Sequence, residues 1–413
     1  SSNAGNDTVF GGSGSDIILT GQGDDLVNGG GGDDYIDGGD GNDIMAGGPG
    51  NDIFIVDQVG DVVTEVLSRG AGGIDTVRTS INYIAPSNVE VLEAQESENL
   101  SLTGNELDNI LEGNDGNNVL IGADGLDILI GKYGSDELDG GNGRDQMVGG
   151  SGDDKYWVDS RSDIIYEEIN AGNDTVFSSS SYVLSANVED LILLGSEKIS
   201  GGGNSLDNRI IGNESDNFIN GGLGDDHMEG GLGDDIYVMD SLGDTIVDTG
   251  GIDTIRASIE ISLPNGIENL TLIGLLNING QGNDGDNEIL GNSSNNLLNG
   301  GLGSDILVGG NGDDGFILDD FRSGVDTIRD FESGSDLLMI DAVAVGLFDP
   351  ETLTGYSGTV EESNFGRTEN PNGDHLFEFN PQNGNLFLTL PDSFVSNLIL
   401  SIDLNNSDEI IAS

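Results

Sequence analysis

The stretch GGDGNDIMA, residues 38–46, is preceded by GGGGDDYID (29–37) and followed by GGPGNDIFI (47–55). All three follow the pattern G-G-x-G-x-D-x-U-x, in which U is an apolar residue. Glycines at positions one, two and four permit positive φ, so the first six residues can turn sharply. The last three have the character of a short β-strand whose central side chain points inward. Each nonapeptide therefore predicts one loop and one strand.

Repetition of this unit predicts a coil. Two nonapeptides on opposite sides close a turn of about 18 residues, and strands of successive turns pair in parallel at about 4.8 Å. We therefore predict an all-β protein, a parallel β-roll or β-solenoid of Gly-Asp-rich nonapeptides with a β-rich C-terminal cap. The pattern occurs at residues 2–10, 11–55, 104–157, 203–238 and 282–317.

The segments between the glycine-rich blocks keep the nine-residue register. Asp61, Asp163 and Asp244 each follow the last sixth-position aspartate of a block by nine residues, and an apolar residue follows each of them two positions later. Asp75 and Asp174 arrive five and two residues late. These delays predict loop insertions in a coil that continues through the spacers.

The chain is thereby divided into repeat blocks, spacers and a C-terminal segment. The sequence HLFEFNPQNGNLFLTL (375–390) has two alternating apolar runs around an Asn-Gly turn signal, which predicts a hairpin. A cap of this kind would cover the open edge of the coil. The predicted segments are block 1 (1–64), a spacer (65–103), block 2 (104–166), a spacer (167–202), block 3 (203–256), a spacer (257–281), block 4 (282–340) and the cap (341–413).

Acidic residues dominate the composition. The chain has 76 Asp and Glu against 12 Lys and Arg, a net charge of −64, and no cysteine. This charge disfavours nucleic acid and anionic membranes as partners, and it opposes compaction unless cations bind. Disulfides and thiolate metal sites are excluded, and no apolar run of about 18 residues predicts a membrane span.

Stacked turns should bring the sixth-position aspartates of alternate nonapeptides together, as with Asp25 and Asp43, beside carbonyl groups turned outward by the glycines. Hard oxygen ligands without nitrogen or sulfur select Ca²⁺ over zinc or copper. We therefore predict multiple calcium ions, about ten or more, as cofactors. The predicted ligands are Asp7, Asp16, Asp25, Asp34, Asp43, Asp52, Asp61, Asp127, Asp136, Asp145, Asp154, Asp163, Asp226, Asp235, Asp244, Asp253, Asp305 and Asp314.

Asparagine replaces aspartate at the sixth position at the start of blocks 2, 3 and 4. An amide oxygen can still bind a cation, but one negative charge is lost. Calcium binding at these positions therefore stays an open question. They are Asn109, Asn118, Asn208, Asn217, Asn287 and Asn296.

The tandem pattern resembles the RTX (repeats-in-toxin) hemolysin-type calcium-binding β-roll over about 340 of the 413 residues. The resemblance implies calcium held between successive loops, secretion through a type I apparatus that reads the C-terminus, and folding triggered by extracellular calcium. The tail LILSIDLNNSDEIIAS (398–413) more weakly resembles the secretion signals of this family, and it can serve as signal, cap or both.

Three functions remain open from the sequence. The first is a calcium-dependent structural and secretion module at the C-terminal end of a larger cell-surface or released protein such as an adhesin. The second is the carrier part of a secreted protease, lipase or polysaccharide-modifying enzyme. The third is binding of a carbohydrate or another surface through the faces of the coil. All three place the chain outside the cell or at its surface, with calcium and the secretion apparatus as partners and a cell-surface or glycan partner as a further candidate.

No residue of the chain is predicted to be catalytic. There are two histidines, His227 and His375, and no nucleophile elbow is evident. The bulky aromatic residues near the block ends are predicted to fill the interior of the coil. They are Phe54, Tyr156, Trp157, Tyr237 and Phe316.

Overall fold

The computed structural model divides into two units, Ser1–Gly212 (unit 1) and Asn213–Ser413 (unit 2). The described residues form strands and turns without any helix, so none of them forms a helix long and apolar enough to cross a membrane. The residues described are 4–65, 73–318, 324, 326–331, 335–340, 377–380, 385–388, 398–403 and 409–412.

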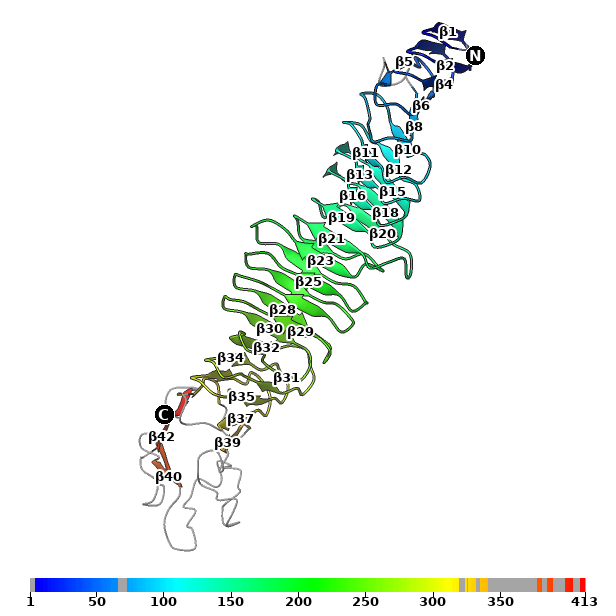
Figure 1. Ribbon diagram of the computed structural model, residues 1–413. Coiled ribbons are helices and arrows are strands. Elements are labelled where there is room, and N and C mark those ends of the chain that lie inside the picture. Colours follow the sequence, from blue (N-terminus) through cyan, green and yellow to red (C-terminus); the bar gives the residue numbers. More distant parts are fainter. Residues whose placement is uncertain are drawn as a thin grey trace. The chain divides into compact units, whose positions relative to one another are not determined.

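Unit 1 is a parallel β-solenoid in which each strand pairs with strands one coil before and after it (Figure 1). One sheet contains, in spatial order, β2 (Ile17–Gln22), β4 (Tyr35–Asp40), β6 (Ile53–Val56), β8 (Thr76–Thr79), β10 (Val91–Ala94), β12 (Ile110–Glu112), β15 (Ile128–Tyr133), β18 (Gln146–Ser151) and β20 (Ile164–Tyr166).

The remaining strands of unit 1 also pair in parallel. One group is β1 (Thr8–Ser13), β3 (Leu26–Gly31), β5 (Ile44–Ala46) and β7 (Val62–Thr64). A second is β9 (Tyr83–Ile84), β11 (Ser101–Thr103), β13 (Val119–Ile121), β16 (Glu137–Asp139), β19 (Lys155–Val158), β21 (Thr175–Ser178), β23 (Asp190–Leu193) and β25 (Arg209–Ile211). Two short pairs are β14 (Asp124–Gly125) with β17 (Asn142–Gly143), and β22 (Tyr182–Val183) with β24 (Ser200–Gly202).

Unit 2 also contains a parallel β-solenoid. One series of parallel strands is β26 (Phe218–Asn220), β28 (Ile236–Met239), β30 (Thr254–Ala257), β32 (Asn269–Leu272), β34 (Glu288–Leu290), β36 (Ile306–Val308) and β38 (Thr327–Ile328). A second is β31 (Ile261–Ser262), β33 (Gly280–Gln281), β35 (Leu297–Asn299), β37 (Gly315–Leu318) and β39 (Leu337–Ile340). The strand β27 (His227–Glu229) pairs with β29 (Thr245–Val247).

The length of a coil follows from the nonapeptide, because two of them close one turn. Thr8 of β1 lies beside Leu26 of β3, and bonded residues of successive coils within the nonapeptide blocks are 18 positions apart. The predicted coil length is thus confirmed. Where the chain carries insertions, Ile53 pairs with Thr76 and Lys155 with Thr175, so that bonded residues are separated by 23 and 20 positions. The predicted insertions are confirmed as well.

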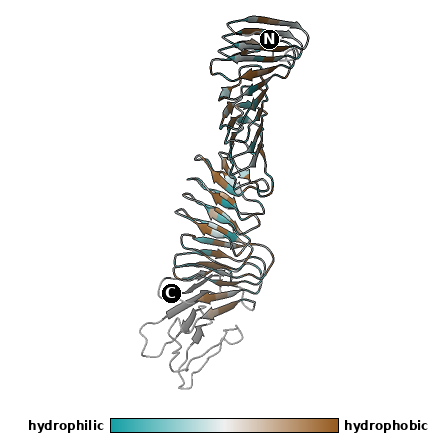
Figure 2. Ribbon diagram, turned by 45° about the vertical axis from the view of Figure 1, so that its right-hand side comes forward, coloured by the Kyte–Doolittle hydropathy of each residue, from teal (hydrophilic) through white to brown (hydrophobic). Residues whose placement is uncertain are grey.

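The core is a file of inward-pointing residues from the eighth position of each nonapeptide. Val27, Ile36 and Met45 are fully buried, and apolar residues lie along the strands of both units (Figure 2). The aromatic side chains at this position fill the interior as predicted, because each has no exposed surface: Phe54, Tyr156, Tyr237 and Phe316.

The prediction for Trp157 was wrong. This residue stands at the ninth position, where side chains point away from the core, and it is partly exposed. Its ring stacks on that of Phe177 one coil later, with 5.2 Å between the ring centroids. The alternation of a strand therefore outweighs the tendency of a large aromatic ring to be buried.

The last strands are antiparallel, in contrast to the coil. The two strands of the predicted hairpin are confirmed, since β40 (Phe377–Asn380) pairs with β41 (Asn385–Leu388). The predicted turn between these strands lies outside the described residues, and so does His375. The strand β41 also pairs with β42 (Leu398–Asp403), and β42 pairs with β43 (Glu409–Ala412). Because β43 pairs with β38, these strands cover an edge of the parallel sheet of unit 2.

Candidate metal centre

The sixth-position aspartates are buried at the point where each glycine loop enters its strand. Asp25 and Asp127 have exposed fractions of 2% and 0%. The backbone N–H of Asp25 donates to Oδ1 of Asp43 at 2.7 Å, and that of Asp127 donates to Oδ1 of Asp145 at 2.8 Å. Each carboxylate therefore joins two successive coils through its first oxygen.

The second carboxylate oxygen, Oδ2, has no hydrogen-bond partner in most of these residues. Leaving a buried charged oxygen unpaired is costly, so a counter-ion is expected there. The residues with a buried, unpaired Oδ2 are Asp25, Asp34, Asp43, Asp52, Asp127, Asp136, Asp145, Asp154, Asp174, Asp235, Asp253, Asp305 and Asp314.

The pKa values of these carboxylates are raised, as expected for buried acids whose second oxygen has no hydrogen-bond partner. Burial, followed by the charge of neighbouring carboxylates, raises the pKa of Asp145 to about 6 and that of Asp154 to about 7. A hydrogen bond from the backbone N–H of the preceding coil lowers the pKa but only partly offsets the burial. Without a bound cation, these groups therefore take up a proton at higher pH than an exposed aspartate does.

Glycine at the first position lets oxygen atoms of two coils approach the backbone closely. A Cβ on Gly29 would overlap Oδ2 of Asp34 and lie against the carbonyl oxygen of Gly47. A carboxylate oxygen of one coil and a carbonyl oxygen of the next therefore face the same space. This set of hard oxygen donors fits Ca²⁺.

Adding a single methyl group at Gly29 should test whether the close approach of oxygen atoms at this glycine matters for stability. Gly29→Ala is expected to lower the unfolding free energy in calcium by about 1–3 kcal/mol, because the new Cβ overlaps atoms of two coils. Gly31→Ala, in the same loop, meets only the carbonyl oxygen of Pro49 at 3.8 Å, so its effect should stay within about 0.5 kcal/mol. Urea unfolding of both variants provides the comparison, and equal midpoints would show that the close approach at Gly29 does not require glycine.

Three predicted ligands differ from the others. Oδ2 of Asp61 accepts the N–H groups of Asp57 and Gln58 at 3.2 and 3.0 Å. Oδ2 of Asp163 and of Asp244 is likewise bonded to N–H groups of its own loop at 3.1 Å. Both oxygens of these carboxylates are therefore engaged by the protein. Asp7 and Asp16 differ in another way, because they lie in the first described coil and are less buried.

Stacked sixth-position aspartates form rows in which each backbone N–H bonds to the carboxylate of the next coil. Several acids that extend these rows were not among the predicted ligands. Asp52 N–H donates to Oδ1 of Asp75 at 2.9 Å, and Asp75 N–H in turn donates to Oε2 of Glu90 at 2.9 Å. The sixth position in GGIDTVR was a usable signal for Asp75. Glutamate was harder to find because its longer side chain reaches the same amide from a different register. The other missed acids in equivalent places are Asp174, Glu189, Glu268, Asp326 and Asp336.

The side-chain amides of the sixth-position asparagines form hydrogen bonds with protein groups, without a cation. Oδ1 of Asn109 accepts the N–H of Asn105 at 2.7 Å, while Nδ2 donates to the carbonyl oxygens of Val89 and Glu90 at 3.0 and 3.2 Å. Asn287 forms the same set of contacts in unit 2. The amide N–H groups thus occupy the carbonyl oxygens of the preceding coil.

Replacing one asparagine by aspartate should expose this difference. Asn109→Asp removes both Nδ2 donors and places a carboxylate against two carbonyl oxygens, which should cost about 1–3 kcal/mol and raise the calcium concentration at which the chain folds. Asn117→Asp is the matched control, because only the oxygen of this exposed side chain accepts a bond, from Ser135 N. Circular dichroism during calcium titration measures both. An unchanged midpoint for Asn109→Asp would show that its amide is dispensable.

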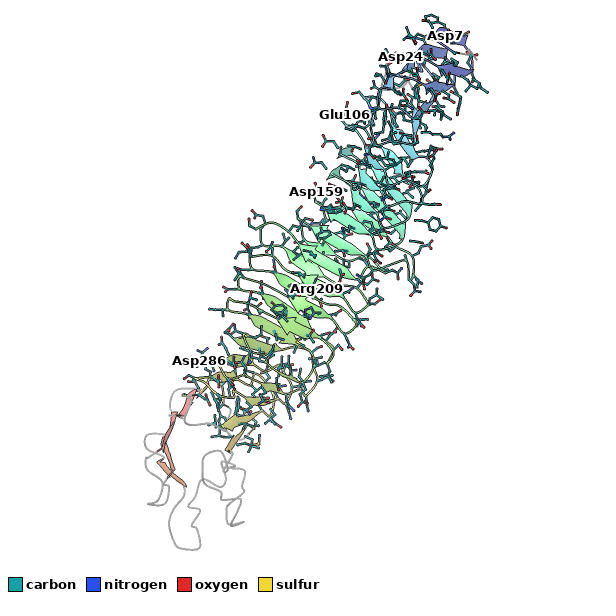
Figure 3. The ribbon with its side chains drawn as sticks, in the orientation of Figure 1. Asp7, Asp24, Glu106, Asp159, Arg209 and Asp286 are labelled. Carbon is teal, nitrogen blue, oxygen red and sulfur yellow. The ribbon has the colours of Figure 1, made fainter. Side chains whose placement is uncertain are left out.

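A second ladder of hydrogen bonds runs through the exposed fifth position. Asp24 N–H donates to Oδ1 of Asn6, and Asn42 N–H donates to Oδ1 of Asp24, both at 3.0 Å. In unit 2, Oδ1 of Asp286 accepts the N–H of Ser304 at 2.7 Å. Asp24 and Asp286 both extend outward from the loops (Figure 3). Coils are therefore joined at position five by exposed bonds and at position six by buried carboxylates.

A comparison with protein families agrees with this geometry. The model of the RTX calcium-binding nonapeptide repeat (4 copies) matches residues 1–27, 19–54, 103–132, 121–156, 202–237 and 281–316. These repeats and the parallel β-solenoid fit an RTX β-roll protein. RTX repeats bind calcium, so the chain contains a calcium-binding RTX module, and proteins with such repeats are typically secreted. The RTX β-roll is generally structural rather than catalytic. No curated protein matches the chain.

Proposed function

We propose that this chain is a module that folds when it meets extracellular calcium. The observation that carries the proposal is the row of buried carboxylate oxygens without a protein partner. A site with a dissociation constant near 0.1 mM, in about 10 mM calcium, gains roughly 2.7 kcal/mol of folding free energy. Repeated over many sites, this gain outweighs the repulsion among stacked carboxylates.

The calcium ions are placed where Oδ2 is unpaired, between a carboxylate of one coil and carbonyl groups of the next. Asp61, Asp163 and Asp244 then act as ends of the rows, because both of their oxygens are already bonded. The asparagine positions hold no calcium in this proposal. The structure thus supports a smaller set of ligands than the regular spacing alone predicts.

In the cell, the proposal implies secretion through a type I apparatus that engages the C-terminus. Where calcium is scarce, the charge of −64 keeps the chain extended and suited to passage through a narrow channel. Outside, calcium drives coiling. The folded module then serves as a structural part of a larger cell-surface or released protein such as an adhesin.

Counting bound ions tests the proposal directly. Equilibrium dialysis of the full chain against calcium, followed by metal analysis, should give about ten ions or more per chain. The increase in strand signal by circular dichroism should follow the same calcium concentrations. Binding of only one or two ions, or strand content independent of calcium, would overturn the proposal.

A second candidate function is carbohydrate binding, which one surface feature of unit 1 favours. The stacked rings of Trp157 and Phe177 line a groove of about 570 Å³ together with Asp124, Asp139 and Asp159. Exposed aromatic rings next to polar groups suit the apolar faces and hydroxyl groups of a sugar. A glycan array in calcium should give a specific signal that Trp157→Ala abolishes. The absence of any specific glycan would refute this candidate.

A further inference from the structure

Three carboxylates and a tyrosine converge at the end of block 2. The ligand atoms of Asp154, Glu167 and Asp174 lie within 4.8 Å of one another, and the Tyr156 hydroxyl donates a hydrogen bond to Glu167. Asp154 and Asp174 are 1% and 0% exposed, and their Oδ2 atoms and Oε2 of Glu167 have no hydrogen-bond partner. Several unpaired carboxylate oxygens are therefore aimed at one small space.

The same arrangement occurs in unit 2, at the end of block 3. Asp235, Asp248 and Asp253 have ligand atoms within 4.8 Å of one another, and the Tyr237 hydroxyl donates to Asp248. Asp248 also accepts a backbone N–H, that of Gly250 at 2.8 Å, through its Oδ1. Asp235 and Asp253 are both 0% exposed, with Oδ2 unpaired. In each cluster the third acid lies after the last nonapeptide of its block, Glu167 after residues 104–157 and Asp248 after residues 203–238.

The other two block ends carry phenylalanine in place of tyrosine and show a different arrangement. Glu65, the counterpart of Glu167, accepts the N–H groups of Gly47 and Gly48 at 2.9 and 3.3 Å. Asp330 accepts the two corresponding glycine amides at 2.8 and 2.7 Å. In these blocks the acid that follows the nonapeptides is held by backbone amides of two glycines.

The tyrosine hydroxyl explains the difference in unit 1. The N–H of Gly149, which corresponds to Gly47, donates to the Tyr156 hydroxyl at 2.8 Å instead of to a carboxylate. The hydroxyl then donates its own proton to Glu167 and holds this side chain beside Asp154 and Asp174. The tyrosine hydroxyl thus takes one of the two glycine amides that bind the acid in the phenylalanine-containing blocks, while the Gly150 amide still bonds to Glu167.

We propose that the two tyrosine-containing clusters are calcium sites of a second kind, in which an acid that follows the last nonapeptide of the block supplies a third carboxylate. The inference rests on the proposed calcium-dependent folding. Calcium affinity increases with the number of charged ligands, so these two sites bind before the regular ones. A bound ion there ties the segment that follows the nonapeptides to the nonapeptides themselves.

The test is a calcium titration of the full chain in competition with a chromophoric chelator. The wild-type chain should show two ions that bind more tightly than the rest. The double variant Glu167→Gln/Asp248→Asn should bind these two ions at least about tenfold more weakly, since each site loses one charged ligand. Asp127→Asn/Asp305→Asn, in the regular rows, is the matched control and should keep both tight ions.

Aromatic substitutions give an independent test that leaves every carboxylate in place. Tyr156→Phe/Tyr237→Phe should lose the two tight ions, because the acids are released toward the glycine amides. Phe54→Tyr should add one tight ion, because its hydroxyl would displace Glu65 from Gly47 toward Asp52 and Asp75. Terbium(III), excited through nearby aromatic rings, should report the same gain as sensitised emission.

Two outcomes separate this inference from the proposed function. If the wild-type chain binds many calcium ions but none is tighter, or if the acid and tyrosine variants keep both tight ions, the clusters hold a proton only and the inference is wrong. The proposed function would survive that result. If the wild-type chain binds no calcium, the proposed function and the inference fail together.

Discussion

Removal of calcium at neutral pH is expected to convert the protein from a strand-rich coil into an expanded chain. Carboxylates such as Asp43 and Asp136 are fully buried, and each has an Oδ2 without a protein partner. Once the cations leave, these charges repel one another at every coil, and burial of one apolar residue per nonapeptide returns only about 1.5–3 kcal/mol. The radius of gyration should approach about 70 Å, the value for an unfolded chain of this length.

Small-angle X-ray scattering and circular dichroism with excess chelator measure this change. Magnesium at the same concentration is the control, because this smaller ion demands regular octahedral geometry and gives up its water reluctantly. It should restore little of the strand signal, whereas calcium should restore all of it. A chelated chain that stays compact would show that backbone pairing and apolar burial suffice without metal.

Acidification is expected to promote folding of the metal-free chain. Burial raises the pKa of Asp75 and Asp305 to about 7 and that of Asp43 and Asp136 to about 6, compared with about 3.9 for an exposed aspartate. Groups that bind protons more tightly in the folded state stabilise it fully below their unfolded pKa. This contribution is lost as the pH rises through the folded pKa. The strand content of the metal-free chain should therefore increase as the pH is lowered from about 7 to about 4.

Calcium should reverse the sign of this dependence. Protons compete with the cation for the same oxygens, so the calcium-loaded chain should lose ions and stability as the pH falls. Circular dichroism of metal-stripped and calcium-saturated protein across this range measures both curves. Parallel curves of the same sign would mean that the buried carboxylates do not govern folding.

The asparagine coils give the blocks a defined starting point. Each of blocks 2, 3 and 4 opens with sixth-position asparagines, and Asn109, Asn208 and Asn287 donate to carbonyl oxygens of the preceding spacer coil. These bonds need no metal. Under the proposed function, a coil joined in this way would template the aspartate coils that follow.

Most of the fold could be predicted from the sequence because its determinants are local. The spacing of glycine and aspartate in GGDGNDIMA sets the loop, the strand and the inward-facing Met45, and tandem repetition sets the 18-residue coil. The prediction failed for Trp157, where residue size was given more weight than strand alternation. It was incomplete at Glu90, because a glutamate that replaces aspartate in the row does not stand at the repeat spacing.

The sequence by itself determined the coil, its inward face and the stacking of acidic residues, since all three follow from the residue pattern of one nonapeptide and its tandem repetition. Only the tertiary structure decided which carboxylate oxygens remain unpaired. That depends on which amides arrive from neighbouring coils, after insertions and spacers have shifted the register. Asp163 and Asp154 illustrate the difference: both stand at the sixth position, yet local N–H groups occupy Oδ2 of the former and leave that of the latter unpaired.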